Sequence, residues 1–167
     1  MSAHKIMENS LLAEIQALRD LTTGRQREYF EAMLAGAKPV ACTPLVDVFT
    51  EHEIELIRVG VQPRKKECYR NAHLMTAYFD DVEYVEGKVG LDCGIAIDHA
   101  FNRRGDHYFD VTWEIALENS VEGVDYLSIG EYDAETVNKV AFETGVYGDI
   151  FRNLYIKSNH GKESKNQ

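Results

Sequence analysis

The sequence predicts an α+β domain in which helices surround a small antiparallel sheet. Two segments rich in β-branched and aromatic residues are joined by a short charged linker, which is typical of a β-hairpin, and helical patterns flank them on both sides. A chain of 167 residues can bury a substantial core without disulfides. We therefore expect one domain over residues 1–156, followed by a polar, flexible tail over 157–167.

Two helices are expected in an N-terminal segment that covers residues 1–36. Asn9 or Ser10 can cap the first helix, whose apolar stripe runs over 11–21, and the second helix covers 25–35. Together they form a helical hairpin that either packs on the core or serves self-association into a homo-oligomer.

The remaining elements are predicted from local start and stop signals. Residues 39–44 read as a break, and Thr50 with Glu53 forms a capping box that opens a short helix. Further along, 124–129 reads as a strand and Asp133 caps another helix. A last short helix or strand covers 150–156.

The hairpin carries the main argument. Its strands are predicted over 94–102 and 107–114, and a two-residue turn at Arg104 and Gly105 would fix how they pair. In that register His99 lies directly opposite Asp110.

Opposed residues on one face of an antiparallel pair have Cβ atoms about 4.5–5.5 Å apart. At that separation the Asp110 carboxylate can accept the Nδ1–H of His99 and fix its tautomer. Because a slip of one residue would place the two side chains on opposite faces, the prediction depends on the register.

Cys68 is the candidate nucleophile. Residues 69–79 carry a helical apolar stripe, so Cys68 lies at or near a helix N-terminus. There the helix dipole and the unpaired backbone N–H groups favour a thiolate, and Lys65, Lys66 and Arg70 act in the same direction. Cys68, His99 and Asp110 therefore form a candidate catalytic triad.

Each of these residues also has a structural interpretation. An isolated cysteine is usually a small buried side chain, which is the expectation for Cys42 and Cys93. A His–Asp pair can be a purely structural hydrogen bond. The combination of all three residue types in a compatible order favours the functional interpretation.

The order of these residues resembles that of transglutaminase-like proteins of the papain-like fold. The resemblance rests on a cysteine at the head of a helix, followed by the motifs Tyr84-Val85-Glu86-Gly87, His99-Ala100-Phe101 and Asp110-Val111-Thr112. It covers about a third of the chain. It departs at Phe101, where the family commonly has Trp.

The resemblance implies a role for each member of the triad. Cys68 would be the nucleophile, His99 the general base and acid, and Asp110 the residue that orients His99. Gln62 has the position of the oxyanion-hole glutamine of papain-like proteases.

Four further residues are candidates for substrate binding. The basic residues Arg64, Lys65 and Arg70 are either a solvated surface or a contact for an acidic substrate beside the thiol. Phe101, next to the histidine motif, is the fourth candidate.

Charge, apolar runs and cysteine spacing argue against several other classes of protein. A net charge of −10 argues against nucleic acid as the main partner, and no apolar run is long enough to span a membrane. The N-terminus lacks a signal-peptide core. Three cysteines without a CxxC pair favour a reducing, cytoplasmic compartment and argue against a metal site. No cofactor is implied.

We therefore expect cysteine-dependent acyl transfer on a protein or peptide-like amide, ending in hydrolysis, deamidation or transamidation. The alternative is a non-catalytic binding module of the same fold, which retains the His–Asp pair for stability and engages a protein partner.

Overall fold

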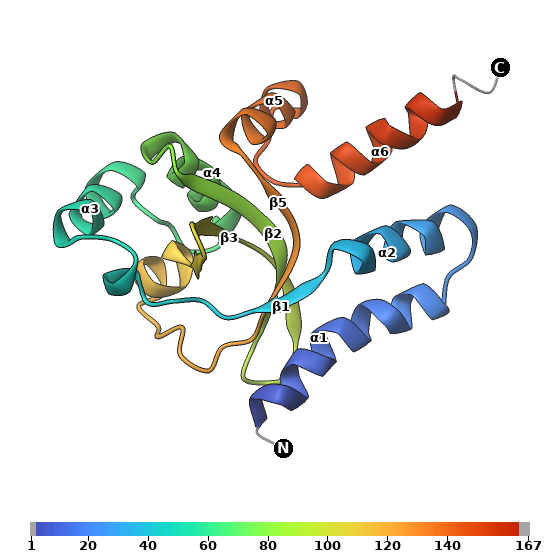
Figure 1. Ribbon diagram of the computed structural model, residues 1–167, viewed down its shortest axis with the longest axis horizontal. Coiled ribbons are helices and arrows are strands. Elements are labelled where there is room, and N and C mark those ends of the chain that lie inside the picture. Colours follow the sequence, from blue (N-terminus) through green and yellow to red (C-terminus); the bar gives the residue numbers. More distant parts are fainter. Residues whose placement is uncertain (1–2, 164–167) are drawn as a thin grey trace.

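One antiparallel sheet of five strands organises the computed structural model, which describes residues 3–163 (Figure 1). The strands lie in the order β1-β5-β2-β3-β4, so β2 is central and almost wholly buried. Their bounds are β1 Lys38–Val40, β2 Val82–Gly90, β3 Ala96–Arg104, β4 His107–Phe109 and β5 Tyr126–Tyr132.

Helices cover the sheet on several sides. The α-helices are α1 Ala3–Asp20, α2 Gly24–Gly36, α3 Glu51–Leu56, α4 Cys68–Tyr78, α5 Ala134–Thr144 and α6 Ile150–Glu163, with short turns η1 Leu45–Asp47, η2 Ile57–Val61 and η3 Thr112–Ala116. α1 and α2 lie side by side against β5, whereas α4 packs on β2 and β3 (Figure 1). Within the described residues, no helix has both the length and the apolar character needed to cross a membrane.

The sheet buries side chains on both faces. On one face Tyr84 and Ala100 cluster with Ala72 of α4. Because side chains alternate along a strand, Phe101 and Tyr126 belong to the opposite face, where they form a second cluster. His99 shares that second face with Phe101, and the two rings are stacked with centroids 6.3 Å apart.

Two helix caps predicted from the sequence are confirmed. The Thr50 hydroxyl accepts a hydrogen bond from the Glu53 N–H at 3.2 Å, and the Glu53 carboxylate accepts one from the Thr50 N–H at 2.8 Å. Asp133 caps α5 by accepting from the Thr136 N–H at 2.8 Å. These local interactions fix where α3 and α5 begin.

The N-terminal helical hairpin is also confirmed, and it packs on the core. Leu11 and Ile15 of α1 are buried in a cluster with Leu127 and Ile129 of β5. α1 begins at Ala3, so the predicted caps Asn9 and Ser10 fall inside the helix.

Three element boundaries differ from the predictions. The segment predicted as a break, 39–44, overlaps the end of β1, where Pro39 is tolerated because an edge strand needs no amide donor on its outer side. The strand predicted over 124–129 is β5, shifted toward the C-terminus. Of the predicted flexible tail over 157–167, residues 157–163 are instead helical, because α6 continues to Glu163 and Lys157 pairs with Glu143 of α5, while 164–167 lie outside the described residues.

The predicted hairpin register is wrong by two positions. The observed pairs are Arg104 with His107 and Asn102 with Phe109, so the turn consists of Gly105 and Asp106. Gly105 has φ of 58°, a conformation that favours glycine and that a type II′ turn requires at its first position. A shift of two residues preserves the faces, so His99 and Asp110 still share one.

β4 is also shorter than predicted and ends before Asp110. One Asp110 side-chain oxygen, Oδ1, accepts a hydrogen bond from the Trp113 N–H at 3.1 Å, and the Asp110 carbonyl accepts one from the Glu114 N–H at 3.1 Å. These local bonds turn the chain into η3, because an aspartate that caps a turn competes with strand pairing.

The close approach of β2 to β5 yields a first prediction. A Cβ added at Gly87 would lie 1.7 Å from the Leu127 carbonyl oxygen, so Gly87→Ala must push the two strands apart. We expect this substitution to lower the free energy of unfolding by about 3 kcal/mol or more, as overpacking against backbone does. Urea unfolding followed by circular dichroism measures the change.

Gly161→Ala is the matched control. Gly161 lies in α6 with no atom within 4 Å of an added Cβ. Alanine there should leave stability unchanged or raise it by about 0.5–1 kcal/mol. An unfolding midpoint for Gly87→Ala equal to that of the wild type would contradict the packing described for β2 and β5.

Candidate active site

Cys68 is the first residue of α4, as the sequence predicts, and its side chain is half-buried. The N–H groups of the first helical turn have no acceptor within the helix. They therefore surround Cys68 with positive partial charge that can stabilise a thiolate or an oxyanion.

A polar cluster fixes the loop that leads into α4. The Asn71 side chain bonds both backbone groups of Arg64, accepting from its N–H at 3.1 Å and donating to its carbonyl at 2.8 Å. It also donates to the Thr112 hydroxyl of η3 at 2.9 Å. Asn71 is fully buried one turn after Cys68, so it holds the Cys68 loop, α4 and η3 in a fixed relation.

His99 and Asp110 form a direct hydrogen bond despite the shifted register. The distance from His99 Nε2 to Asp110 Oδ2 is 2.7 Å, and both side chains are buried. The expected contact through Nδ1 is wrong, because the ring presents Nε2 to the carboxylate. His99 also interacts with the Cys68 thiol, and with Nε2 engaged by Asp110, Nδ1 is the nitrogen left for sulfur.

Two further groups hold the Asp110 carboxylate. The Tyr126 hydroxyl donates to Oδ2 at 2.8 Å, the same oxygen that accepts from His99, and the Trp113 N–H donates to Oδ1. Asp110 has no exposed surface, so its charge depends on these partners for stabilisation. The carboxylate is fixed from three elements: β3, β5 and η3.

The electrostatics of this pair favour a protonated histidine. Burial lowers the pKa of His99, but the negative charge and hydrogen bond of Asp110 and the interaction with Cys68 outweigh it and raise the pKa to about 10. The ring is therefore an imidazolium at neutral pH.

A second thiol, Cys42, interacts with Tyr126 of this network. Burial together with the charge of Asp110 raises the pKa of Cys42 well above its usual value. Cys42, which we expected to be only a small buried side chain, thus interacts with a residue of the candidate site. Cys93, also expected to be buried, is instead exposed on the turn between β2 and β3.

Glu114, a carboxylate whose pKa lies near neutral pH, is close to Asp110. Glu114 of η3 accepts hydrogen bonds from the Leu45 N–H at 3.0 and 3.3 Å. Burial raises the pKa of Glu114 to about 7, with the charges of Asp110 and Asp47 acting in the same direction.

Gln62 and Arg70 interact through the backbone of the loop. Gln62 is exposed, and its carbonyl accepts a hydrogen bond from Arg70 at 3.2 Å. Arg70 also bonds the Val61 carbonyl at 3.2 Å, so its guanidinium holds the loop in place. Neither side chain contacts Cys68 or His99 through a bond found among the described residues.

The remaining candidates for substrate binding divide into surface and core positions. Arg64 and Lys65 are exposed near the thiol, and Arg64 pairs only loosely with Glu67 at 3.7 Å. Phe101 is 1% exposed. This corrects its expected role, because Phe101 packs beneath His99 and does not face a cleft.

Tyr126, Cys42 and Asn71 are members of the site that the sequence did not identify. Each contributes through a long-range contact, and none stands in a local motif. Residues 3–163 contain no cluster of three His, Cys, Asp or Glu side chains placed to hold a metal ion.

Comparison with protein-family models, with curated proteins and with solved structures found no match for this chain. Function must therefore be argued from the geometry of the site.

The charge on His99 yields a second prediction, for the ionisation of its ring. Wild-type His99 should stay doubly protonated from pH 6 to pH 8.5, because its pKa is about 10. In Asp110→Asn the charge that raises the pKa is lost while burial remains, so the pKa should fall below the ordinary value of about 6.5. Nitrogen-15 NMR of the imidazole measures both.

Cys68→Ala serves as the comparison variant. It removes a smaller contribution than Asp110 does, so the pKa of His99 should fall by less. An imidazole that titrates alike in wild type and Asp110→Asn would show that Asp110 does not control the charge of His99.

Proposed function

We propose that Cys68, His99 and Asp110 catalyse acyl transfer through a thioester intermediate. The observation that carries the proposal is the buried His99–Asp110 hydrogen bond of 2.7 Å, whose imidazole also interacts with a thiol at the start of a helix. An imidazole held by a carboxylate beside a nucleophile is the arrangement that general acid–base and nucleophilic catalysis need.

The first step forms the thioester. In the resting site the proton of the Cys68 thiol already resides on His99, which is the imidazolium described above, and the Cys68 thiolate attacks the carbonyl carbon of an amide, an ester or a thioester. The tetrahedral oxyanion is stabilised by the Cys68 N–H, with Gln62 as a second candidate donor. When the bond to the leaving group breaks, the proton on His99 passes to that group.

The second step regenerates the thiol. Water or an amine attacks the thioester carbon and loses its proton to His99, and the C–S bond breaks to release Cys68. Water gives hydrolysis or deamidation, whereas an amine gives transamidation. A protein or peptide-like amide is the substrate class that we propose.

The resemblance to transglutaminase-like proteins of the papain-like fold remains part of this proposal. It is supported by the order of the elements, with the Cys68 helix preceding the strands of His99 and the segment of Asp110. Cys42, Cys68 and Cys93 are unpaired, which is in keeping with a reducing, cytoplasmic location.

The test is the rate of alkylation of Cys68 by iodoacetamide as a function of pH, followed by mass spectrometry of the peptide. We expect rapid labelling of wild type below neutral pH, and a fall of about tenfold or more in His99→Ala because the imidazolium partner is lost. His99→Gln retains a hydrogen-bond donor toward Asp110 and guards against simple unfolding of the alanine variant.

Two internal references sharpen this measurement. His107→Ala removes an exposed histidine of β4 and should leave Cys68 labelling unchanged, while the exposed Cys93 reports the reactivity of a solvated thiol in each sample. Slow labelling of Cys68 only above about pH 8, alike in wild type and both His99 variants, would assign the site a structural role. The non-catalytic binding module would then be the better description.

Tyr126 is assigned a positioning role, which makes a separate prediction. Tyr126→Phe keeps the ring against Phe101 but removes the donor to Asp110. A hydrogen bond to a charged group contributes about 1.5 kcal/mol, so Cys68 labelling at pH 6 should slow by about tenfold.

Tyr108→Phe is the matched control. Its hydroxyl bonds Glu131 at 3.0 Å on the same face of the sheet and has no bond to Asp110. Equal labelling rates for the Tyr126 and Tyr108 variants at every pH would remove Tyr126 from the mechanism.

A further inference from the structure

A cavity of about 250 Å³ lies against β2 and β3 on the sheet face opposite to His99, and it has no part in the chemistry described above. Tyr69 and Asp98, which are the chain neighbours of Cys68 and His99, both line it, as does Gly87, which pairs with His99. Pockets for drug-sized ligands measure about 300–1,000 Å³. The cavity therefore matches a single side chain or a small molecule.

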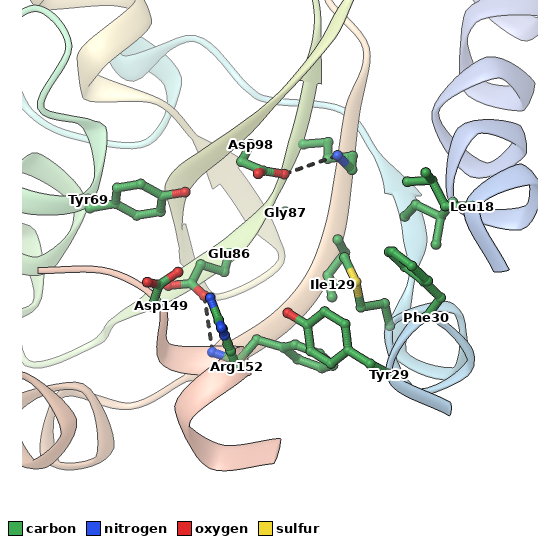
Figure 2. A pocket seen from close by; sticks show the side chains of 14 residues that line it. Leu18, Tyr29, Phe30, Tyr69, Glu86, Gly87, Asp98, Ile129, Asp149 and Arg152 are labelled. Atoms are coloured by element: carbon green, nitrogen blue, oxygen red, sulfur yellow. Dashed lines mark hydrogen bonds and ion pairs between the residues drawn. The ribbon is translucent and has the colours of Figure 1, made fainter. Parts of the chain in front are cut away.

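One wall of the cavity is apolar and aromatic. It comes from α1, α2 and the start of α6, and Figure 2 shows Tyr29 and Phe30 on it. Phe151 of α6 also belongs to this wall. The Tyr29 ring lies 5.9 Å from Phe30 and 5.8 Å from Phe151, centroid to centroid. Ile15, Leu18, Met33 and Ile129 complete this wall.

The opposite wall carries charge, with an excess of carboxylates. Glu86, Asp98 and Asp149 line the cavity together with the cations Lys88 and Arg152. Lys88 is already neutralised, because its ammonium lies 3.0 Å from Asp98 and also faces Glu14 of α1 at 3.8 Å. Glu86 is buried, burial raises its pKa, and its oxygens already accept hydrogen bonds from the Tyr84 hydroxyl and from the Ile150 and Phe151 N–H groups. Asp149 and Arg152 are the remaining charged residues of this wall, so the cavity lining carries more carboxylates than cations.

Asp149 is the carboxylate most available to a ligand. It is exposed at the start of α6, and no side-chain bond to Asp149 is found within residues 3–163. The backbone of Asp149 has a φ of 54°. The preceding residue is Gly148, whose missing Cβ lets the backbone lie against the Tyr69 ring. This contact fixes Asp149 and Tyr69 on the same side of the cavity (Figure 2).

Two tyrosine hydroxyls point into the cavity without a hydrogen-bond partner in the described part of the chain. They belong to Tyr29 and Tyr69, which enter from opposite sides (Figure 2). Burial raises the pKa of both, and the charges of the three cavity carboxylates act in the same direction, although Arg152 opposes them at Tyr29. The negative charge of the cavity carboxylates and the acceptor oxygens of Tyr29 and Tyr69 favour a cation as the ligand.

We propose that the cavity binds a guanidinium group on a short aliphatic stem. A guanidinium stacks on aromatic rings and is less strongly hydrated than an ammonium, so an aromatic wall facing carboxylates suits it better. Tyr29 offers the ring, Asp149 offers the charge, and the apolar residues accommodate the stem. The source is either an arginine side chain of a protein or a free alkylguanidine.

Isothermal titration calorimetry on the full chain carrying Cys68→Ala tests this proposal. Without the thiol there is no turnover, so binding is measured independently of the acyl-transfer chemistry. Butylguanidine should bind about tenfold or more tightly than butylamine, and butanol and butyrate more weakly still. Acetyl-arginine methylamide distinguishes the sources: tighter binding than butylguanidine indicates an arginine side chain, and weaker binding a free guanidine.

Asp149→Asn should weaken butylguanidine binding about fivefold or more, because asparagine keeps the backbone conformation but loses the charge. Asp92→Asn, an exposed acid outside the cavity lining, is the matched control and should have no effect. Butyrate binding more tightly than butylguanidine, equal binding of butylamine, or identical affinities for the two variants would each overturn the proposal. Binding of butylguanidine together with unreactive Cys68 would instead establish a binding module.

Discussion

The buried carboxylate of Asp110 is the group on which the candidate site depends. It accepts hydrogen bonds from His99, Tyr126 and Trp113, so it joins β3, β5 and η3 around one negative charge. A buried ion without such partners would cost several kcal/mol. The same bonds that make the charge tolerable inside the core also fix the imidazole, and the stability of this region and its chemistry therefore rest on one set of contacts.

A second set of buried polar contacts positions Cys68 relative to the hydrogen bonds of Asp110. Asn71 binds the loop before α4 and the Thr112 hydroxyl, which lies two residues after Asp110. Asn102 donates to the Ala72 carbonyl at 2.8 Å and so fastens α4 to β3. Because α4 is held at two points, the position of Cys68 relative to His99 is set by rigid elements. A thiol and an imidazole are useful together only when such a fixed geometry brings them into contact.

Features that depend on residues close together in the sequence were predicted well, whereas contacts between residues far apart in the sequence were not. The start of α4 at Cys68, the cap at Thr50 and the shared face of His99 and Asp110 all follow from local signals. The predicted register failed because Gly105 takes the first position of the two-residue turn, where its positive φ is required, whereas the prediction placed it second. Tyr126 could not be found in this way, since its hydroxyl meets Asp110 only after β5 has joined the sheet beside β2.

The N-terminal helices have a consequence that follows from where they lie. α1 and α2 pack against β5 and supply much of the aromatic and aliphatic wall of the cavity, whereas Cys68, His99 and Asp110 lie on later segments of the chain. The proposed thiol site and the proposed guanidinium cavity therefore draw largely on separate stretches of the polypeptide. Substitutions at the residues of α1 and α2 that line the cavity would alter the proposed binding of a guanidinium without removing any member of the proposed triad.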